Sequence, residues 1–174
     1  MQSYRVVAVG DRIADAVRTT MLSPGYGHPA HADVATGHGP CRQCLRAFTV
    51  GADRRILFTY DAFYGKEDIP LPGPVFIHEA QCERYPADAG FPVDMLSHKL
   101  TLNAYGRGRR LLAQRYVSNG IIEPELQRLL ANEEVDYIHV RDTKAGCYDF
   151  CIERASESEG LTKVAASARG ASHE

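Results

Sequence analysis

Apolar and polar positions alternate in several short segments of this chain, which is the pattern of β-strands that bury one face. The clearest case is 100–105, where Leu100, Leu102 and Ala104 alternate with Thr, Asn and Tyr. Other segments are rich in the β-branched and aromatic residues that favour strands. The further strands that we predict are 4–9, 55–60, 74–78, 110–117, 135–141 and 147–154.

Two longer segments carry apolar residues at the three- and four-residue spacing of an amphipathic helix. We predict one helix over 11–21, with Asp11 as its N-cap. A second helix begins at 123–125, with Pro124 in its first turn. Each helix therefore presents one apolar face to a core.

The remaining segments are expected to be connectors. Segment 23–40 is rich in Gly, Pro and His and is predicted to be a loop. Segment 41–48 fits either a helical turn after Pro40 or the beginning of a strand. We expect one or two helical turns at 79–85, and a short helix at 93–96.

Strands that follow one another as hairpins, with few helices between them, indicate an α+β fold. We expect a mainly antiparallel sheet with a few short helices on it, and the first strand and helix leave room for one parallel crossover. The chain has 174 residues, a length typical of one domain with one core. We place this domain at 1–154 and interpret 155–174, which is rich in Ser, Ala, Glu and Gly, as a disordered tail.

Composition and charge exclude several classes of partner. The net charge of −2 provides no overall positive field, so we do not expect nucleic acid as a partner. No stretch approaches the roughly 20 apolar residues of a membrane-spanning helix, and we expect no membrane association. Five cysteines without an apparent export signal indicate reduced thiols and a cytoplasmic protein. The sequence leaves the oligomeric state open, a homodimer included.

Two cysteines lie three positions apart directly before an apolar run. Cys41 and Cys44 supply two of the four nitrogen or sulfur ligands of a tetrahedral zinc ion, because this spacing lets one tight turn direct both sulfurs at one point. His78 and Cys82 are the natural second pair, since residues i and i+4 share one face of a helix. The sequence therefore predicts a metal site formed by these four residues, with zinc as the metal.

Two other interpretations of these cysteines stay open. Pro40 can place the Cys41 thiol at a helix N-terminus, where its pKa falls, as in a thiol-redox pair. The cysteines can equally be small side chains that fill the core. The functional hypotheses are accordingly a metal-binding domain, an enzyme that uses a thiol, and a non-catalytic interaction domain with structural cysteines.

The last two predicted strands place several reactive side chains on one face. If the connecting loop is short, His139 lies opposite Asp149 and Arg141 lies opposite Cys147. A carboxylate beside an imidazole fixes its tautomer, which general bases and metal ligands both need. These four residues are our candidate catalytic residues, acting on a small anionic substrate that pairs with Arg141 or Arg42.

In the same register Val140 pairs with Tyr148, and Tyr137 lies opposite Cys151. The alternative is that this face is only the solvated side of a half-buried sheet, which is the usual state of antiparallel hairpins. Two cysteines on the face count against this alternative, because cysteine is usually buried.

Several of these segments together resemble a known family. The segments that carry the resemblance are 39–45 (GPCRQCL), 57–63 (LFTYDAF), 73–78 (GPVFIH) with Cys82, and 137–141 (YIHVR) followed by 146–148 (GCY). The chain resembles the bacterial domain of unknown function 1203 family over roughly residues 4–154. The resemblance implies a compact cytosolic bacterial protein but no activity. It also implies that the family's shared motifs include Cys41, Cys44, His78, Cys82, His139, Arg141 and Cys147.

Overall fold

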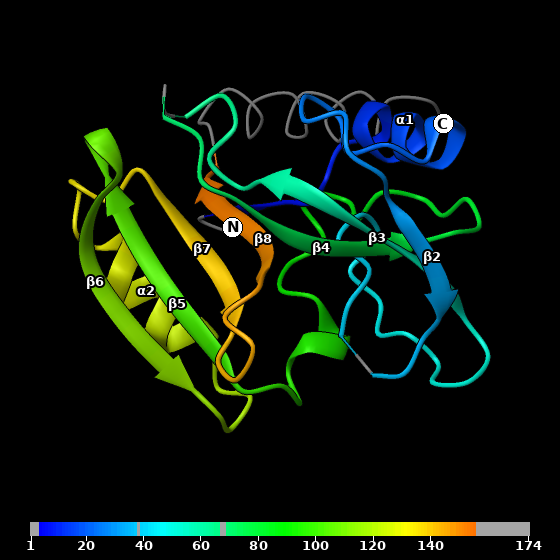
Figure 1. The fold of residues 1–174 in the computed structure, drawn as a ribbon. Helices are drawn as coiled ribbons and strands as arrows, with labels where there is room; N and C mark the ends of the chain where they lie inside the picture. Colours follow the sequence, from blue (N-terminus) through cyan, green and yellow to red (C-terminus); the bar gives the residue numbers. More distant parts are fainter. Residues whose placement is uncertain (1–3, 38, 67–68, 156–174) are drawn as a thin grey trace, which may run out of the picture.

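The computed structural model describes residues 4–37, 39–66 and 69–155. Its described strands form two antiparallel sheets, one in the order β1-β8-β7-β5-β6 and one in the order β2-β3-β4 (Figure 1). The larger sheet contains β1 (Tyr4–Val7), β5 (Leu100–Gly106), β6 (Arg110–Val117), β7 (Tyr137–Asp142) and β8 (Tyr148–Arg154). The smaller sheet contains β2 (His31–Val34), β3 (Arg54–Asp61) and β4 (Pro72–His78). The predicted α+β fold with mainly antiparallel strands is confirmed.

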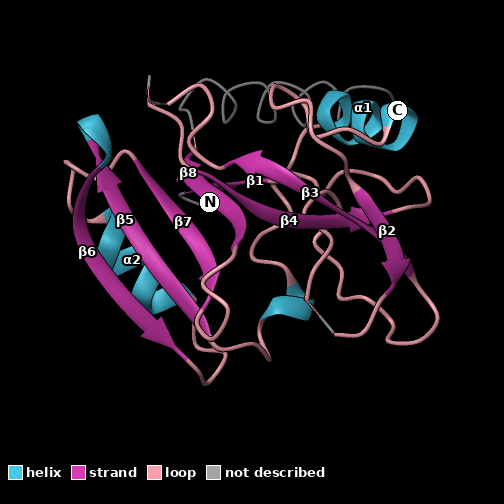
Figure 2. Ribbon diagram, in the orientation of Figure 1, coloured by secondary structure: helices cyan, strands magenta, loops and turns pink. Residues whose placement is uncertain are grey.

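The described helices are few and short (Figure 2). They are α1 (Asp11–Thr20), α2 (Glu123–Leu130) and the 3-10 helices η1 (Val93–Met95) and η2 (Arg107–Arg109). No described helix has the length and apolar character needed to cross a membrane. The predicted disordered tail lies, from residue 156 on, outside the described residues.

The two central strands β7 and β8 separate two hydrophobic clusters. On one face Phe150 and Ile152 pack with Leu102 and with the leucines of α2, which covers this side of the sheet in Figure 1. On the other face Tyr148 and Cys151 pack with apolar residues of the smaller sheet and of α1. Because both faces are covered, the first four residues of β7 and the first five of β8 are all buried. The alternative of a solvated hairpin face is therefore wrong.

The register of the β7–β8 hairpin also differs from the prediction. His139 lies opposite Cys151 instead of Asp149, and Tyr137 lies opposite Glu153. A β-bulge in the ladder leaves Asp149 on β8 without a directly opposite partner. Alternation counted from the sequence missed this extra residue, because a bulge changes the register without changing the pattern of residue types.

The same bulge changes which way Tyr148 faces. Tyr148 pairs with Arg141, and Val140 pairs with Phe150. The Tyr148 ring consequently lies 5.0 Å from the His139 ring, centroid to centroid, whereas the prediction put these two side chains on opposite faces. Neither Val140 with Tyr148 nor Arg141 with Cys147 forms the predicted pair.

Several local predictions are wrong for identifiable reasons. Strand β2 lies inside the predicted loop 23–40. Nothing in the sequence indicated it, because all four of its side chains are exposed and form no apolar pattern. Segment 79–85 contains no helix, and segment 41–48 forms a turn with an isolated bridge. The N-cap of α1 is Gly10 instead of Asp11. Strand β1 pairs antiparallel with β8, so the chain has no parallel crossover there.

Candidate metal centre

Cys41 and Cys44 lie on one tight turn that its own backbone holds in place. The Leu45 N–H donates to the Cys41 carbonyl at 2.8 Å, and the Cys41 N–H donates to the Arg46 carbonyl at 2.9 Å. Leu45 adopts the left-handed conformation, with φ of 57°, which closes the turn. Both cysteines are buried, so their thiols lie in the interior of the protein.

The second pair of predicted ligands comes from the end of β4 and the segment that follows. The Arg42 N–H donates to the Phe76 carbonyl at 2.9 Å, which fixes the cysteine turn against β4. The His78 N–H donates to the Cys41 sulfur at 3.3 Å. Cys82 lies in irregular backbone, and its sulfur is 3.8 Å from that of Cys41. The pair therefore converges through a loop and not through the helix face that the sequence suggested.

Two separations among the four donor atoms match those of a tetrahedral zinc site. The sulfurs of Cys41, Cys44 and Cys82 and a ring nitrogen of His78 all lie within 4.8 Å of one another. Zinc bond lengths at tetrahedral angles imply S–S distances of about 3.8 Å and S–N distances of about 3.5 Å. Cys41 and Cys82 are separated by 3.8 Å, and Cys44 Sγ lies 3.4 Å from His78 Nδ1. The cluster therefore fits one metal ion.

A carboxylate orients the His78 ring from the side away from the sulfurs. Asp53 Oδ2 lies 3.6 Å from His78 Nε2 and accepts a hydrogen bond from the Thr49 N–H at 2.7 Å. The Phe48 ring packs edge-on against the imidazole, with centroids 4.7 Å apart. Nδ1 therefore faces the Cys44 sulfur and Nε2 faces a carboxylate, which is the usual arrangement around a metal-bound histidine.

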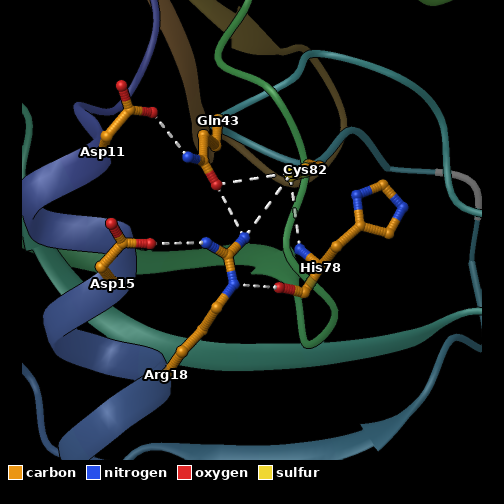
Figure 3. Close-up of polar contacts among 7 residues, drawn as sticks. Asp11, Asp15, Arg18, Gln43, His78 and Cys82 are labelled. Atoms are coloured by element: carbon orange, nitrogen blue, oxygen red, sulfur yellow. Dashed lines mark hydrogen bonds and ion pairs between the residues drawn. The ribbon is translucent and has the colours of Figure 1, made fainter.

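Arg18 of α1 closes the cluster on another side (Figure 3). Its Nε donates to the His78 carbonyl at 3.0 Å, and its Nη2 donates to Gln43 Oε1 at 2.7 Å and to the Cys82 sulfur at 3.6 Å. Gln43 is fixed in turn by donating to Asp11 Oδ1 at 2.8 Å. A nearly buried guanidinium thus lies beside the outermost sulfur, where it stabilises negative charge.

The electrostatics of the cluster favour one thiolate and oppose a second. Hydrogen bonds from Cys44 and Cys82 lower the pKa of Cys41. Hydrogen bonds with the buried thiols of Cys41 and Cys44 raise the pKa of His78 to about 10. The pKa of Cys82 is raised because a second thiolate would lie directly beside the first. A divalent cation at the centre removes this conflict by replacing the protons.

Comparison with protein families places the cluster inside a shared region. The family model "Protein of unknown function (DUF1203)" matches residues 38–154, about two thirds of the chain. The chain belongs to the DUF1203 family. The matched region contains all four cluster residues, whereas Arg18 lies outside it. No curated protein and no solved structure matched the chain.

The DUF1203 region also contains a buried ion pair that joins the cysteine turn to β8. Arg42 Nη2 lies 2.9 Å from Asp149 Oδ1, and both side chains are almost completely buried. Arg42 also donates to the Tyr148 carbonyl at 2.8 Å and to the Pro40 carbonyl at 2.6 Å. The guanidinium therefore connects the turn between two candidate ligands to the bulge of the larger sheet.

His139 lies apart from this cluster, in an aromatic box between the two sheets. Rings of four residues lie within 5.3 Å of its ring, centroid to centroid: Phe63, Tyr105, Tyr137 and Tyr148. Within the described residues neither ring nitrogen of His139 has a hydrogen-bond partner. Burial and the nearby charges of Arg141 and Lys66 lower the pKa of His139 to about 3. The side chain is therefore neutral at physiological pH.

We predict that His139 makes the folded protein sensitive to mild acid. Between pH 6.5 and about 3 the unfolded chain binds a proton on this residue that the folded chain does not, so stability falls as the pH falls. His139→Leu should remove this sensitivity. Relative to the wild type, the variant should gain about 2 kcal/mol of unfolding free energy between pH 7.5 and pH 5.0, as measured by urea denaturation.

Protonation of the metal cluster affects both of these proteins alike, so their difference isolates His139. If the difference in unfolding free energy between wild type and variant is the same at pH 7.5 and pH 5.0, the imidazole titrates normally in the folded protein.

The four candidate catalytic residues do not share one site. Arg141 and Cys147 line the same small cavity beside the β7–β8 turn, but neither His139 nor Asp149 lines it. His139 lies in the aromatic box, and Asp149 pairs with Arg42. The sequence did not reveal Arg18, Asp53 or the aromatic box, because these contacts join residues far apart in the chain.

Proposed function

We propose that this chain is a zinc-binding domain in which Cys41, Cys44, His78 and Cys82 hold one Zn²⁺. The observation that carries this proposal is the agreement of two donor–donor distances, 3.8 Å and 3.4 Å, with those of tetrahedral coordination. Three sulfurs and one imidazole are a donor set that zinc favours over hard cations. The Asp53 contact to the far nitrogen of His78 supports the same conclusion.

The role of the ion is structural. Four protein ligands fill the tetrahedral shell, whereas catalytic zinc sites keep one position open for water or substrate. The ligands join the turn after β2, the end of β4 and the irregular segment after it. The segments that carry the three cysteines lie outside helices and strands, so the metal would cross-link them to the end of β4.

Charge and access also support a zinc ion here. Three thiolates and Zn²⁺ carry a net charge of −1, and the guanidinium of Arg18, which also pairs with the exposed Asp15 at 3.4 Å, donates to the Cys82 sulfur. A cleft of about 590 Å³ lies beside Cys82 and is lined in part by Asp11, Asp15 and Glu83, which provides a route for a cation. None of the five cysteines forms a disulfide, and we infer a reducing compartment such as the cytoplasm.

The metal content of matched cysteine variants tests the proposal. Purified wild-type protein should contain close to one zinc ion per chain, as measured by inductively coupled plasma mass spectrometry. Cys82→Ala should lose most of its zinc. Loss of a hydrogen-bond partner of a ligand typically weakens metal affinity roughly 10–100-fold, and loss of a ligand itself should weaken it at least as much. Cys147→Ala is the control and should keep its zinc, since Cys147 lies outside the cluster.

A wild-type protein without near-stoichiometric metal, when expressed with ample zinc, would contradict the proposal. Full retention of zinc by Cys82→Ala would contradict the assigned ligand set.

A further inference from the structure

A second site lies where the two sheets meet, beside the β7–β8 turn. A cavity of about 200 Å³ is enclosed there by the Tyr60 end of β3, the first residues of β4 and the turn before β8. Its apolar walls include Tyr60, Pro74, Val75 and Tyr148. None of the four candidate zinc ligands lines it, so the cavity is independent of the metal centre.

One positive charge, that of Arg141, faces this cavity and forms no ion pair within the described residues, although it acts on Asp149 at longer range and lowers the pKa of that carboxyl. Arg141 is the single charged side chain among the lining residues. Its Nη1 donates to the Gly146 carbonyl at 3.2 Å, and within the described residues its guanidinium pairs with no carboxylate. The nearby carboxylates of Asp61 and Asp142 accept backbone N–H groups instead, and Asp149 pairs with Arg42. Among the described residues only Gly146 accepts a hydrogen bond from Arg141, so most of the guanidinium N–H groups are left by these residues for an anion.

The other polar side chains of the cavity are donors as well. The rings of Tyr60 and Tyr148 lie 5.8 Å apart, and both residues line the cavity together with the Cys147 thiol. Burial raises the pKa of Tyr60 to about 12 and that of Tyr148 well above its usual range, so both phenols stay protonated. The Cys147 thiol donates to the Ala145 carbonyl at 3.9 Å, so the guanidinium and the two phenols are the donors suited to an acceptor-only group such as a carboxylate.

We propose that this cavity binds a small organic carboxylate with a flat apolar body. Arg141 pairs with the carboxylate, and the Tyr60 and Tyr148 rings with the proline-rich start of β4 enclose the apolar part. The volume is suited to such a ligand, because a cavity of about 150 Å³ holds one benzene molecule. This site is separate from the zinc centre and does not depend on the function proposed for it.

Titration of the zinc-loaded full chain with benzoate tests the proposal by NMR. Saturable shifts should appear at backbone amides of the β7–β8 turn and the start of β4, with a dissociation constant of about 1 mM or tighter. Arg141→Gln should weaken benzoate binding at least tenfold, because a charge-assisted pair is lost. Arg110→Gln is the control and should leave the constant unchanged, since Arg110 is an exposed residue that pairs with Glu134.

Two further probes identify what the cavity recognises. Benzyl alcohol has the same ring without the charge and should bind at least tenfold more weakly than benzoate. Inorganic phosphate has the charge without the ring and should also bind more weakly. Benzyl alcohol that matches benzoate, or phosphate that binds more tightly, would overturn the proposal.

Protection of Cys147 gives an independent measure if Arg141→Gln is poorly folded. Benzoate should slow the alkylation of Cys147 by iodoacetamide, followed by mass spectrometry of its peptide, in the wild type. Arg141→Lys keeps the charge without the planar fork and should show weaker protection. No protection in the wild type at saturating benzoate, or an equal dissociation constant in a folded Arg141→Gln, would overturn the proposal.

Discussion

Removal of zinc by a chelator is expected to lower the melting temperature of this protein by roughly 10 °C or more. Structural zinc sites contribute binding free energies comparable with the whole stability of a small domain. Here the ion would join the turn of Cys41 and Cys44 to the last residue of β4, His78, and to Cys82 in irregular backbone. The measurement is a thermal melt followed by circular dichroism, with and without chelator, at pH 7.5.

The cysteine variants provide the controls for this melt. Cys147→Ala should melt like the wild type and respond equally to the chelator. Cys82→Ala should have a low melting temperature before chelator is added, and the chelator should not lower it further. A wild-type melting temperature that the chelator leaves unchanged, although the metal is shown to be removed, would mean that the ion does not stabilise the fold.

Loss of Arg42 is expected to be the most damaging single substitution away from the ligands. Arg42→Met leaves the Asp149 carboxylate buried without its partner and removes two hydrogen bonds to backbone carbonyls. Breaking such a buried pair typically lowers the free energy of unfolding by about 3–5 kcal/mol. Urea denaturation at pH 7.5 measures this loss. The exposed variant Arg115→Met should lose less than about 1 kcal/mol.

The charge of Asp149 explains how this loss should vary. Burial raises the pKa of Asp149 to about 6, so below this pH the folded protein holds the carboxyl neutral. The loss in Arg42→Met should therefore shrink as the pH falls toward 5, and the double variant Arg42→Met/Asp149→Asn should recover part of it at pH 7.5. A double variant no more stable than Arg42→Met alone would show that the lost hydrogen bonds, and not the unpaired charge, cause the damage.

Most strands were predictable because each buries at least one apolar face. The alternation at 100–105 predicted β5, and the leucine spacing after Pro124 predicted α2. Strand β2 was not predictable, since its four exposed residues carry no apolar signal and only pairing with β3 makes them a strand.

The candidate metal site was predictable in its residues but not in its construction. The spacing of Cys41 and Cys44 and the chemistry of His78 and Cys82 indicated the four donors. The expected helix that was to join the second pair does not exist, and backbone contacts to the cysteine turn bring His78 into place instead. Contacts across such distances leave no local pattern in a sequence.

For the β7–β8 hairpin the strands were predictable, but the contacts between the candidate catalytic residues were not. Strand parity placed His139 beside Asp149, but the bulge at Asp149 sends this carboxylate to Arg42 and leaves His139 among aromatic rings. His139, Arg141 and Asp149 were correctly placed on the last two strands, whereas Cys147, which was also predicted on the last strand, lies in the turn before it. The geometry separates the four residues into an ion pair, an aromatic box and a cavity wall.

Anomalous diffraction from crystals of the full chain at the zinc absorption edge tests the central claim most directly. We predict one strong anomalous peak enclosed by the sulfurs of Cys41, Cys44 and Cys82 and by Nδ1 of His78, at bond lengths of about 2.3 Å to sulfur and about 2.0 Å to nitrogen. A peak elsewhere, or no peak among these four side chains in zinc-supplied protein, would contradict it.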